Sequence, residues 1–155
     1  MDNLPVTITA VDSDPGGLLA LRYEWLRCTT RDEEFESRLR DWWAAERHHR
    51  WALVAETSDG EPVGMANALV YTRMPSPGQP TARWLYSANV YVSPVFRRRG
   101  IVTALMARLI GDAREEGMER VVLAPSEMSK PMYRSLGFRE ADDLMRLDLG
   151  VPQRL

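Results

Sequence analysis

The chain has 155 residues, of which 45% are hydrophobic and 27% are charged, a size and mixture typical of one compact globular domain over residues 1–155. Twenty Lys and Arg residues against 22 Asp and Glu residues give a formal net charge of −2, so no general positive field attracts nucleic acid or an anionic membrane surface. The sequence has no apolar run of the roughly 18 residues that a membrane span needs. We expect no secretory leader, because Met1–Pro5 lacks the basic start and long apolar run of one. A single cysteine, Cys28, excludes an intramolecular disulfide, and we expect it to be a small buried residue in a cytoplasmic protein.

The first part of the chain predicts one strand and two helices. β-Branched residues predict a strand over Val6–Val11, and an Asp-Pro pair followed by spaced apolar residues predicts a helix over Asp14–Leu26. Thr30 and Glu33 have the spacing of a capping box, which satisfies two backbone N–H groups at a helix start. A second helix is therefore expected from this point to about His48.

The middle of the chain predicts three consecutive strands. Trp51–Thr57 and Pro62–Tyr71 flank Gly60, which can take a positive φ without a Cβ clash, so these segments predict a hairpin. A proline-containing loop leads to a third strand, Arg83–Val92. Pro94 must end this strand because it has no N–H to donate to a ladder.

The last part of the chain changes to a helical period. Apolar residues on two adjacent stripes predict a helix over Gly100–Gly117, and Arg120–Ala124 predicts a short apolar strand. A strand, a long helix and a strand imply a right-handed crossover, which makes Leu85–Val92 and Arg120–Ala124 a parallel pair. Pro131–Leu136 predicts a short helix, and Leu144–Leu149 alternates as a final strand. The fold class is therefore α/β, a mixed α+β sheet centred on one parallel pair.

Three consecutive arginines precede the long helix. Arg97, Arg98, Arg99 and Gly100 join the carboxyl end of a strand to the amino end of a helix, where unpaired N–H groups and the helix dipole favour anions. Gly100 has no Cβ to hold an anion away from the backbone, and guanidinium groups match phosphate oxygens. The alternative is a solvated surface cluster. Because cations oppose the positive end of the dipole, the arrangement favours a local phosphate site.

Other common sites are missing from the sequence. A Walker P-loop and an early Gly-x-Gly-x-x-Gly are both absent, which weakens nucleotide hydrolysis and dinucleotide redox chemistry as functions. The adjacent His48 and His49 point in different directions on a helix, and no other His or Cys has metal-ligand spacing. We therefore expect no metal.

Three segments, in order and at matching spacing, resemble the Gcn5-related N-acetyltransferase (GNAT) superfamily. Asn89–Pro94 is similar to its central strand, Arg97–Val102 to its Arg/Gln-x-x-Gly-x-Gly/Ala acyl-CoA loop, and Tyr133–Phe138 to its Tyr-x-x-x-Gly-Phe signature. The resemblance covers Leu85–Phe138 at the level of motifs. It implies a single domain with a mostly antiparallel sheet, a splayed central parallel strand pair and flanking helices. It also implies transfer of acetyl from acetyl-CoA to a primary amine, by direct attack in a ternary complex.

The resemblance implies roles for particular residues. Tyr133 would protonate the departing thiolate of CoA. Ala88 stands where many members carry a glutamate base, so a water held by Asn89 and Ser126 would relay the amine proton instead. Val102 stands where the family usually has Gly or Ala. The backbone segments that would hold pantetheine and pyrophosphate consist of Val90, Tyr91, Val92, Arg97, Arg98, Arg99, Gly100, Ile101, Val102 and Thr103.

The acceptor pocket is expected between the two N-terminal helices and the loop Thr72–Thr81. A small-molecule or peptide amine, cationic and partly apolar, would suit the aromatic and acidic residues there; the alternative is that the aromatics are core and the acids a solvated face. These residues are Tyr23, Trp25, Phe35, Trp42 and Trp43, with Glu24, Asp32, Glu33, Glu34 and Glu36.

A second function is compatible with the same fold. Ala88 and Val102 favour a non-catalytic acyl-CoA-binding or protein-interaction module, whereas Tyr133 favours the enzyme. A nucleic-acid-binding role is disfavoured because Arg97–Arg99 is the only dense basic run. Exposed edge strands are compatible with a homodimer.

Overall fold

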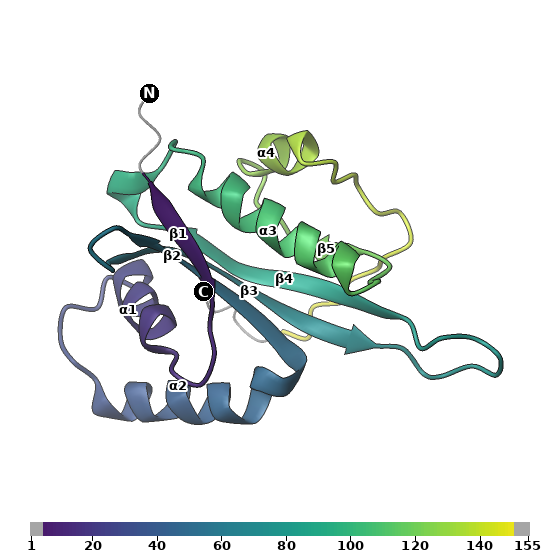
Figure 1. Cartoon of the computed structure of the whole chain (residues 1–155), viewed down its shortest axis with the longest axis horizontal. Helices are drawn as coiled ribbons and strands as arrows, with labels where there is room; N and C mark the ends of the chain where they lie inside the picture. Colours follow the sequence, from purple (N-terminus) through teal and green to yellow (C-terminus); the bar gives the residue numbers. More distant parts are fainter. Residues whose placement is uncertain (1–4, 151–155) are drawn as a thin grey trace. The chain divides into compact units, whose positions relative to one another are not determined.

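The structure of the protein is a computed structural model that describes residues 5–150 (Figure 1). The chain forms two compact units, Met1–Ala124 and Pro125–Leu155, and each is described by itself. The predicted single domain over 1–155 stays a prediction. The expectation that the chain has no secretory leader concerns its first residues, and residues 1–4 lie outside the described residues.

The first unit contains a five-stranded sheet whose spatial order follows the chain. Neighbouring strands are antiparallel except for the last pair, which is parallel, as the crossover argument predicts. The mixed α/β class is therefore confirmed. The strands are β1 (Val6–Ala10), β2 (Arg50–Thr57), β3 (Pro62–Thr72), β4 (Arg83–Val92) and β5 (Val121–Leu123).

Three helices belong to this unit: α1 (Gly16–Trp25), α2 (Glu33–Glu46) and α3 (Ile101–Glu115). The predicted capping box at Thr30 is wrong. Asp32 is the residue before α2, and its carboxylate accepts the N–H of Phe35 at 2.9 Å, so a side chain two residues closer to the helix satisfies that donor. The α-helix also ends at Glu46, and a 3₁₀ turn continues it to His49.

The alternation of side chains along the strands gives the sheet two buried faces. One face places Ala52, Val54, Met65 and Tyr91 in a cluster with residues of α1 and α2. The opposite face carries α3, and Figure 1 shows α1 and α2 on one side of the strands and α3 on the other. Burial on both faces explains why β2 and β3 are almost continuously apolar.

The helix α3 lies very close to β3 at Gly64. A Cβ at this glycine would stand 3.0 Å from Cγ2 of Ile101, 3.3 Å from Cδ1 of Leu105 and 3.3 Å from Cγ2 of Val92. Ile101 and Leu105 are both buried. The missing side chain at position 64 therefore lets the start of α3 pack against the sheet.

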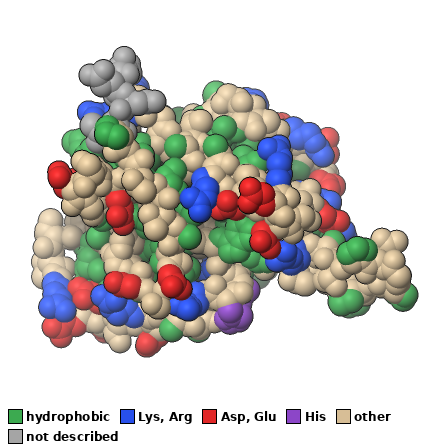
Figure 2. All heavy atoms as spheres, viewed as in Figure 1, with side chains coloured by type: hydrophobic (Ala, Val, Ile, Leu, Met, Phe, Trp, Pro, Cys, Tyr) green, Lys and Arg blue, Asp and Glu red, His purple; other side chains and the backbone are tan. Residues whose placement is uncertain are grey.

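Two further expectations for the fold are wrong. The segment Leu144–Leu149 is not a strand, and its apolar side chains are exposed. A strand needs a neighbouring strand to complete its hydrogen bonds, and the described sheet ends at β5. Cys28 is exposed rather than buried, since it follows the end of α1. The loop of residues 73–82 projects beyond the strands, and Figure 2 shows its tip as hydrophobic and uncharged surface. Among the described residues, no helix is long and apolar enough to cross a membrane.

We predict that Gly64→Ala lowers the free energy of unfolding by about 1–3 kcal/mol, because the new methyl group overpacks the contact between β3 and α3. Gly111→Ala is the matched control. It lies within α3, with no atom within 4 Å of its Cβ, so it should raise stability by up to about 1 kcal/mol. Urea denaturation of both variants measures the difference, and equal midpoints for the two would contradict the packing argument.

Candidate active site

The strand β4 contains a bulge next to its carboxyl end. Met65 pairs with Tyr91 and Asn67 pairs with Ala88, so two residues of β4, Asn89 and Val90, stand opposite one residue of β3. Asn89 has a φ of 51°, in the left-handed region that asparagine tolerates better than most residues. The extra residue breaks the regular ladder at this point.

The other edge of β4 is open beyond its first half. β5 pairs with Leu85, Tyr86 and Ser87 only, and no described strand continues the pairing toward Val92. Backbone groups along this stretch are therefore available to an extended ligand that pairs like an added strand. The predicted residues Val90, Tyr91 and Val92 lie here, although the side chains of Tyr91 and Val92 are buried, so only their backbone can serve.

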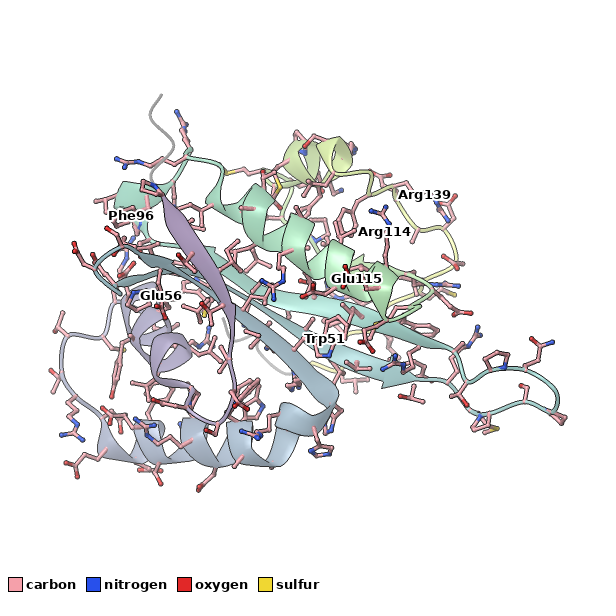
Figure 3. All side chains as sticks on the ribbon, in the orientation of Figure 1. Trp51, Glu56, Phe96, Arg114, Glu115 and Arg139 are labelled. Carbon is pink, nitrogen blue, oxygen red and sulfur yellow. The ribbon has the colours of Figure 1, made fainter. Side chains whose placement is uncertain are left out.

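The arginine loop connects β4 to α3 through a 3₁₀ turn over Pro94–Phe96. Figure 3 places Phe96 at the end where α3 begins, opposite the end that carries Arg114 and Glu115. Nε of Arg97 donates to the carbonyl oxygen of Val92 at 3.0 Å, which fixes the start of the loop on the strand.

Two left-handed residues shape this loop: Arg98 has a φ of 61° and Gly100 a φ of 77°. Such turns direct successive N–H groups toward one point and form concave anion sites. Gly100 precedes the first helical residue, so the N–H groups of Ile101, Val102 and Thr103 have no acceptor within the helix. No protein atom lies within 4 Å of a Cβ at Gly100, so the loop is open to a pyrophosphate.

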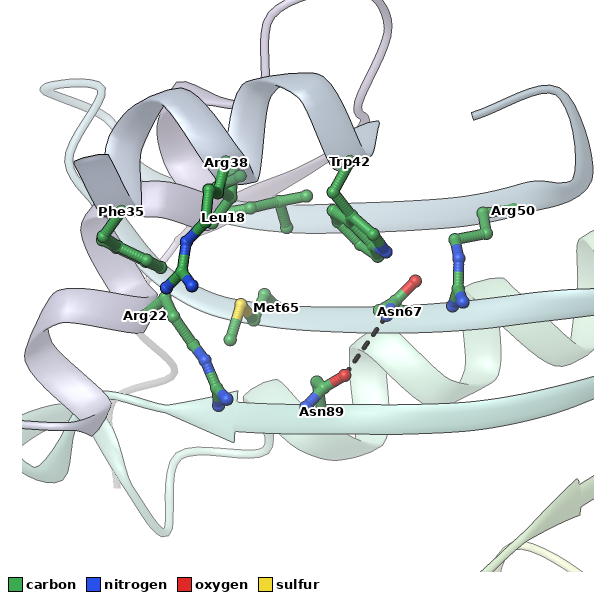
Figure 4. Close-up of a pocket in the computed structure, with 10 residues that line it drawn as sticks. Leu18, Arg22, Phe35, Arg38, Trp42, Arg50, Met65, Asn67 and Asn89 are labelled. Atoms are coloured by element: carbon green, nitrogen blue, oxygen red, sulfur yellow. Dashed lines mark hydrogen bonds between the residues drawn. The ribbon is translucent and has the colours of Figure 1, made fainter. Parts of the chain in front are cut away.

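A pocket of about 520 Å³ lies on the sheet face that carries α1 and α2 (Figure 4). It reaches the bulge of β4, because Asn89 is one of its residues. Leu18, Arg22, Phe35, Arg38, Leu39, Trp42, Arg50, Met65, Asn67 and Asn89 line it.

The expected acceptor pocket is partly right. It does form at the two N-terminal helices, and Phe35 and Trp42 line it as predicted. None of the predicted acidic residues lines it, so the expectation that they supply negative charge to this pocket is wrong; Glu33 and Glu34, for example, are exposed first-turn residues of α2. The loop 72–81 does not line it either, since the loop projects beyond the sheet.

The other predicted aromatic residues pack elsewhere. Trp43 is buried in the core and its Nε1 donates to the carbonyl of Asp12. Trp25 stacks on Tyr91 with ring centroids 5.1 Å apart, and the Tyr91 hydroxyl donates to Glu24 at 3.0 Å. Burial and the neighbouring carboxylate of Glu24 raise the pKa of Tyr91, so this phenol stays protonated.

Two asparagines meet in the pocket. Nδ2 of Asn67 donates to Oδ1 of Asn89 at 3.2 Å, which joins β3 to the bulge. Asn67 is 5% exposed, and its own Oδ1 has no hydrogen-bond partner among the described residues. A buried acceptor without a donor costs free energy, so this oxygen is suited to receive a donor from a ligand.

The sequence analysis missed Arg22, Arg38, Arg50 and Asn67. A signal was present, because Arg22 follows Leu18 by four residues and Arg38 precedes Trp42 by four, which places both arginines on the apolar stripes of their helices. Asn67 likewise shares the face of Met65, two residues before it.

Tyr133 and Ser126 belong to the second unit. Tyr133 lies on α4 (Lys130–Ser135), is 8% exposed and contacts Phe138 edge to face at 5.5 Å between ring centroids. Burial raises the pKa of Tyr133, which keeps its hydroxyl protonated. Ser126 is exposed, and its hydroxyl donates to that of Ser129 at 3.0 Å.

The described residues contain no group of three or more His, Cys, Asp or Glu side chains that could hold a metal ion.

We predict that Asn89→Ala is less stable than Asn89→Gly by about 1 kcal/mol, since both variants lose the amide but only glycine accepts the positive φ without strain. Ala88→Gly is the control at the neighbouring residue of β4, whose φ is not positive; there glycine should cost about 0.5–1 kcal/mol. Thermal or urea unfolding compares them. An alanine variant as stable as the glycine variant would contradict the strained bulge.

Comparison with known proteins identifies the family. Residues 18–138 match the acetyltransferase (GNAT) family model. A curated glucosamine 6-phosphate N-acetyltransferase of Trypanosoma brucei brucei is 34% identical over 90 residues, which span 58% of this chain and 59% of that protein. A crystal structure of a predicted acetyltransferase with acetyl-CoA from Clostridium acetobutylicum has a TM-score of 0.73 at 22% identity and covers 94% of this chain and 97% of that one. A GCN5-related N-acetyltransferase from Ralstonia eutropha has a TM-score of 0.69 at 25% identity, over 94% of this chain and all of that one. The chain belongs to the acetyltransferase (GNAT) family.

Proposed function

We propose that the protein is an N-acetyltransferase that transfers acetyl from acetyl-CoA to the primary amine of a small molecule. The family match supports the reaction class. The curated relative is named for an amino sugar phosphate, and the matched region spans 59% of its length. A pocket of about 520 Å³ has the size of a small-molecule site, which favours such an acceptor over a peptide.

One observation carries this proposal: the open edge of β4 leads directly into a loop with two left-handed residues at the start of α3. An extended pantetheine amide chain suits the first feature, and a pyrophosphate suits the second. Backbone groups of Val90 and Val92 would pair with pantetheine. The N–H groups from Arg98 to Thr103 would hold the phosphates, with Arg97, Arg98 and Arg99 supplying positive charge.

The reaction follows from bringing the two substrates together at the bulge. Acetyl-CoA supplies the acetyl group as an activated thioester. A neutral amine in the pocket attacks it directly, and the N–H of Val90 would stabilise the negative charge that develops on the carbonyl oxygen. Because the pocket reaches Asn89, the amine and the end of β4 are neighbours. Fixing both reactants in this way converts a bimolecular step into an effectively unimolecular one.

Two proton transfers complete the reaction. Tyr133 would donate its hydroxyl proton to the departing thiolate, and its burial supports this role because it keeps the phenol protonated at neutral pH. No carboxylate lines the pocket, and Asn89 cannot accept a proton. A water held by Asn89 and Ser126 would therefore pass the amine proton to solvent. A cytoplasmic location and a homodimer stay predictions.

We predict that acetyl-CoA binds to one site per chain with micromolar affinity. Gly100→Ala should weaken this binding by tenfold or more, which is a loss of about 1.4 kcal/mol or more in binding free energy. A methyl group at this position has no other protein atom within 4 Å, so apart from the strain of the positive φ it would interfere with a bound phosphate. Calorimetric titration of the purified protein measures both affinities.

Gly117→Ala is the matched control for this titration. Gly117 follows the other end of α3, has a φ of 68° and also has nothing within 4 Å of its Cβ. The two variants should therefore lose similar stability, but Gly117→Ala should bind acetyl-CoA normally. Equal affinities for all three proteins would place the phosphates elsewhere, and no binding to the parent protein would favour the non-catalytic interaction module.

We predict that Tyr133→Phe lowers kcat by about 10²–10⁴ while the affinity for acetyl-CoA stays the same, because only the proton donor is lost. Tyr71→Phe, on an exposed tyrosine of β3, is the control and should leave kcat unchanged. Ser126→Ala should instead alter the pH profile of the rate. The appearance of the free thiol of CoA, released from acetyl-CoA at saturating acceptor, measures these rates. Normal turnover by Tyr133→Phe would exclude Tyr133 as the proton donor.

A further inference from the structure

We propose that Asn67 is a specificity-determining residue that selects acceptor amines with a hydroxyl group, whose O–H donates a hydrogen bond to its Oδ1. This proposal rests on the proposed function, because it specifies the substrate class of the same site. It is supported by the burial of Asn67, by the register of the sheet around it and by the residues that line the pocket.

The amide of Asn67 is held in one orientation by Asn89. Nδ2 of Asn67 donates to Oδ1 of Asn89 at 3.2 Å, and Figure 4 shows the oxygen of Asn67 pointing away from Asn89. Turning the amide of Asn67 alone would bring two oxygens together. Asn67 is 5% exposed, and its Oδ1 has no hydrogen-bond partner among the described residues. A buried acceptor of this kind costs free energy until a donor reaches it.

The neighbours of Asn67 on the sheet cannot supply that donor. The register pairs Asn67 with Ala52 of β2 on one side and with Ala88 of β4 on the other. Residues that stand directly opposite each other direct their side chains to the same face of a sheet, and a methyl group donates no hydrogen bond. Because both neighbours are small, they also leave the amide of Asn67 accessible from the pocket that it lines.

Arg50 lines the same pocket but donates elsewhere. Its Nε donates to a carboxylate oxygen of Glu46 at 2.8 Å, and its guanidinium lies 5.1 Å from the ring centroid of Trp42. Both contacts are made to α2 and hold the guanidinium in place. The donor for Oδ1 of Asn67 must therefore come from water or from a bound molecule. A hydrocarbon group that displaced the water would leave this oxygen unpaired.

A hydroxyl group suits this position better than a second ammonium group. No Asp or Glu lines the pocket, so no carboxylate there would stabilise a second positive charge, which burial disfavours. A hydroxyl is the smallest neutral donor. Leu39, Trp42 and Met65 line the pocket as well and suit the carbon skeleton between the amine and the hydroxyl. These features together favour an amino alcohol as the acceptor.

The test compares primary amines that differ at one group. With saturating acetyl-CoA, kcat/KM is measured for propanolamine, for butylamine, which has a methyl group in place of the hydroxyl, and for methoxypropylamine, the methyl ether. A cyclic set consists of aminocyclohexanol, methylcyclohexylamine and methoxycyclohexylamine, each as the trans isomer with its two groups on opposite carbons of the ring. The ether keeps the effect of the oxygen on the basicity of the amine but has no O–H to donate.

We expect the alcohol of at least one set to react about 10–100 times faster than both of its analogues, which is the range for leaving a buried acceptor unpaired. A site built to bind a hydroxyl discriminates in this way against molecules that lack it. Equal rates for the alcohol and the alkyl amine in both sets would overturn the proposal. So would equal rates for the alcohol and the ether, because the pocket would then present a donor rather than Oδ1.

Two variants separate the oxygen of Asn67 from its bond to Asn89. Asn67→Leu removes the oxygen and Asn89→Gly keeps it, while both lose the hydrogen bond between the two amides. Asn67→Leu should lower the alcohol-to-alkyl ratio of kcat/KM about 10–100-fold, to near one. Asn67→Ala, which adds no volume, should do the same. Asn89→Gly should lower the rates with both acceptors alike and keep their ratio.

The ratio distinguishes recognition from a structural role, since a merely distorted site would lose activity with every acceptor. An unchanged ratio in both Asn67→Leu and Asn67→Ala would overturn the proposal. An equal loss of the ratio in Asn89→Gly would also overturn it, because the bond between the amides, and not Oδ1, would then carry the effect.

A binding measurement separates this proposal from the proposed function. If acetyl-CoA acetylates no amine, the proposed function fails. NMR with CoA present then follows the side-chain amide of Asn67, identified by its absence in Asn67→Leu, during titration with propanolamine and with butylamine. A shift of this resonance with the alcohol but not with the alkyl amine supports the proposal without turnover. The same response to both, or no response to either, overturns it.

Discussion

Asn89 and Val90 of β4 stand opposite a single residue of β3, and this extra residue decides which face of the sheet each later residue of β4 takes. Because side chains alternate along a strand, one inserted residue reverses the faces of everything after it. Tyr91 therefore faces α1, where it stacks on Trp25, and Val92 faces α3, where it meets the start of that helix beside Gly64. Without the insertion the two would exchange faces. A phenol would then lie against α3, and the core under α1 would lose its stacked tyrosine.

The bulge also joins the pocket on one face to the arginine loop beyond the end of the strand. Asn89 lines the pocket, and only three residues separate it from Ser93, which precedes the loop. Arg97 then bonds back to Val92, and the left-handed Arg98 and Gly100 turn the chain into α3. Among the described residues, two of the three non-glycine residues with a positive φ, Asn89 and Arg98, lie in this stretch, where the two substrates are proposed to meet.

The sequence predicts those parts of the fold that depend on local periodicity. β4 has the predicted bounds, and β2, β3 and α3 are close to theirs, because each combines an apolar pattern with a clear terminator such as Gly60, Pro94 or Gly117. Features that depend on which other part of the chain a segment contacts are not predicted correctly. The alternating segment after Leu144 forms no strand, and the helix cap belongs to Asp32 rather than Thr30. The sequence analysis assigns no role to Arg22 and Arg38 of the pocket, although their helical spacing places them with Leu18 and Trp42.

No carboxylate lines the pocket, so no acidic side chain there can accept the proton that the amine loses. Asn67 and Asn89 can orient an amine but cannot take its proton, and Ala88 offers no side chain to do so. In the proposed reaction the amine would then lose its proton to water, so the rate should depend on the amine's own pKa, and amines of low basicity should be favoured. Binding free energy from the rest of the acceptor, held in the pocket, would compensate for a missing base, because it fixes the neutral amine in an attacking position. The part of the pocket away from the bulge would thus contribute to the rate through the geometry of the substrate, although its residues would not touch the reacting atoms.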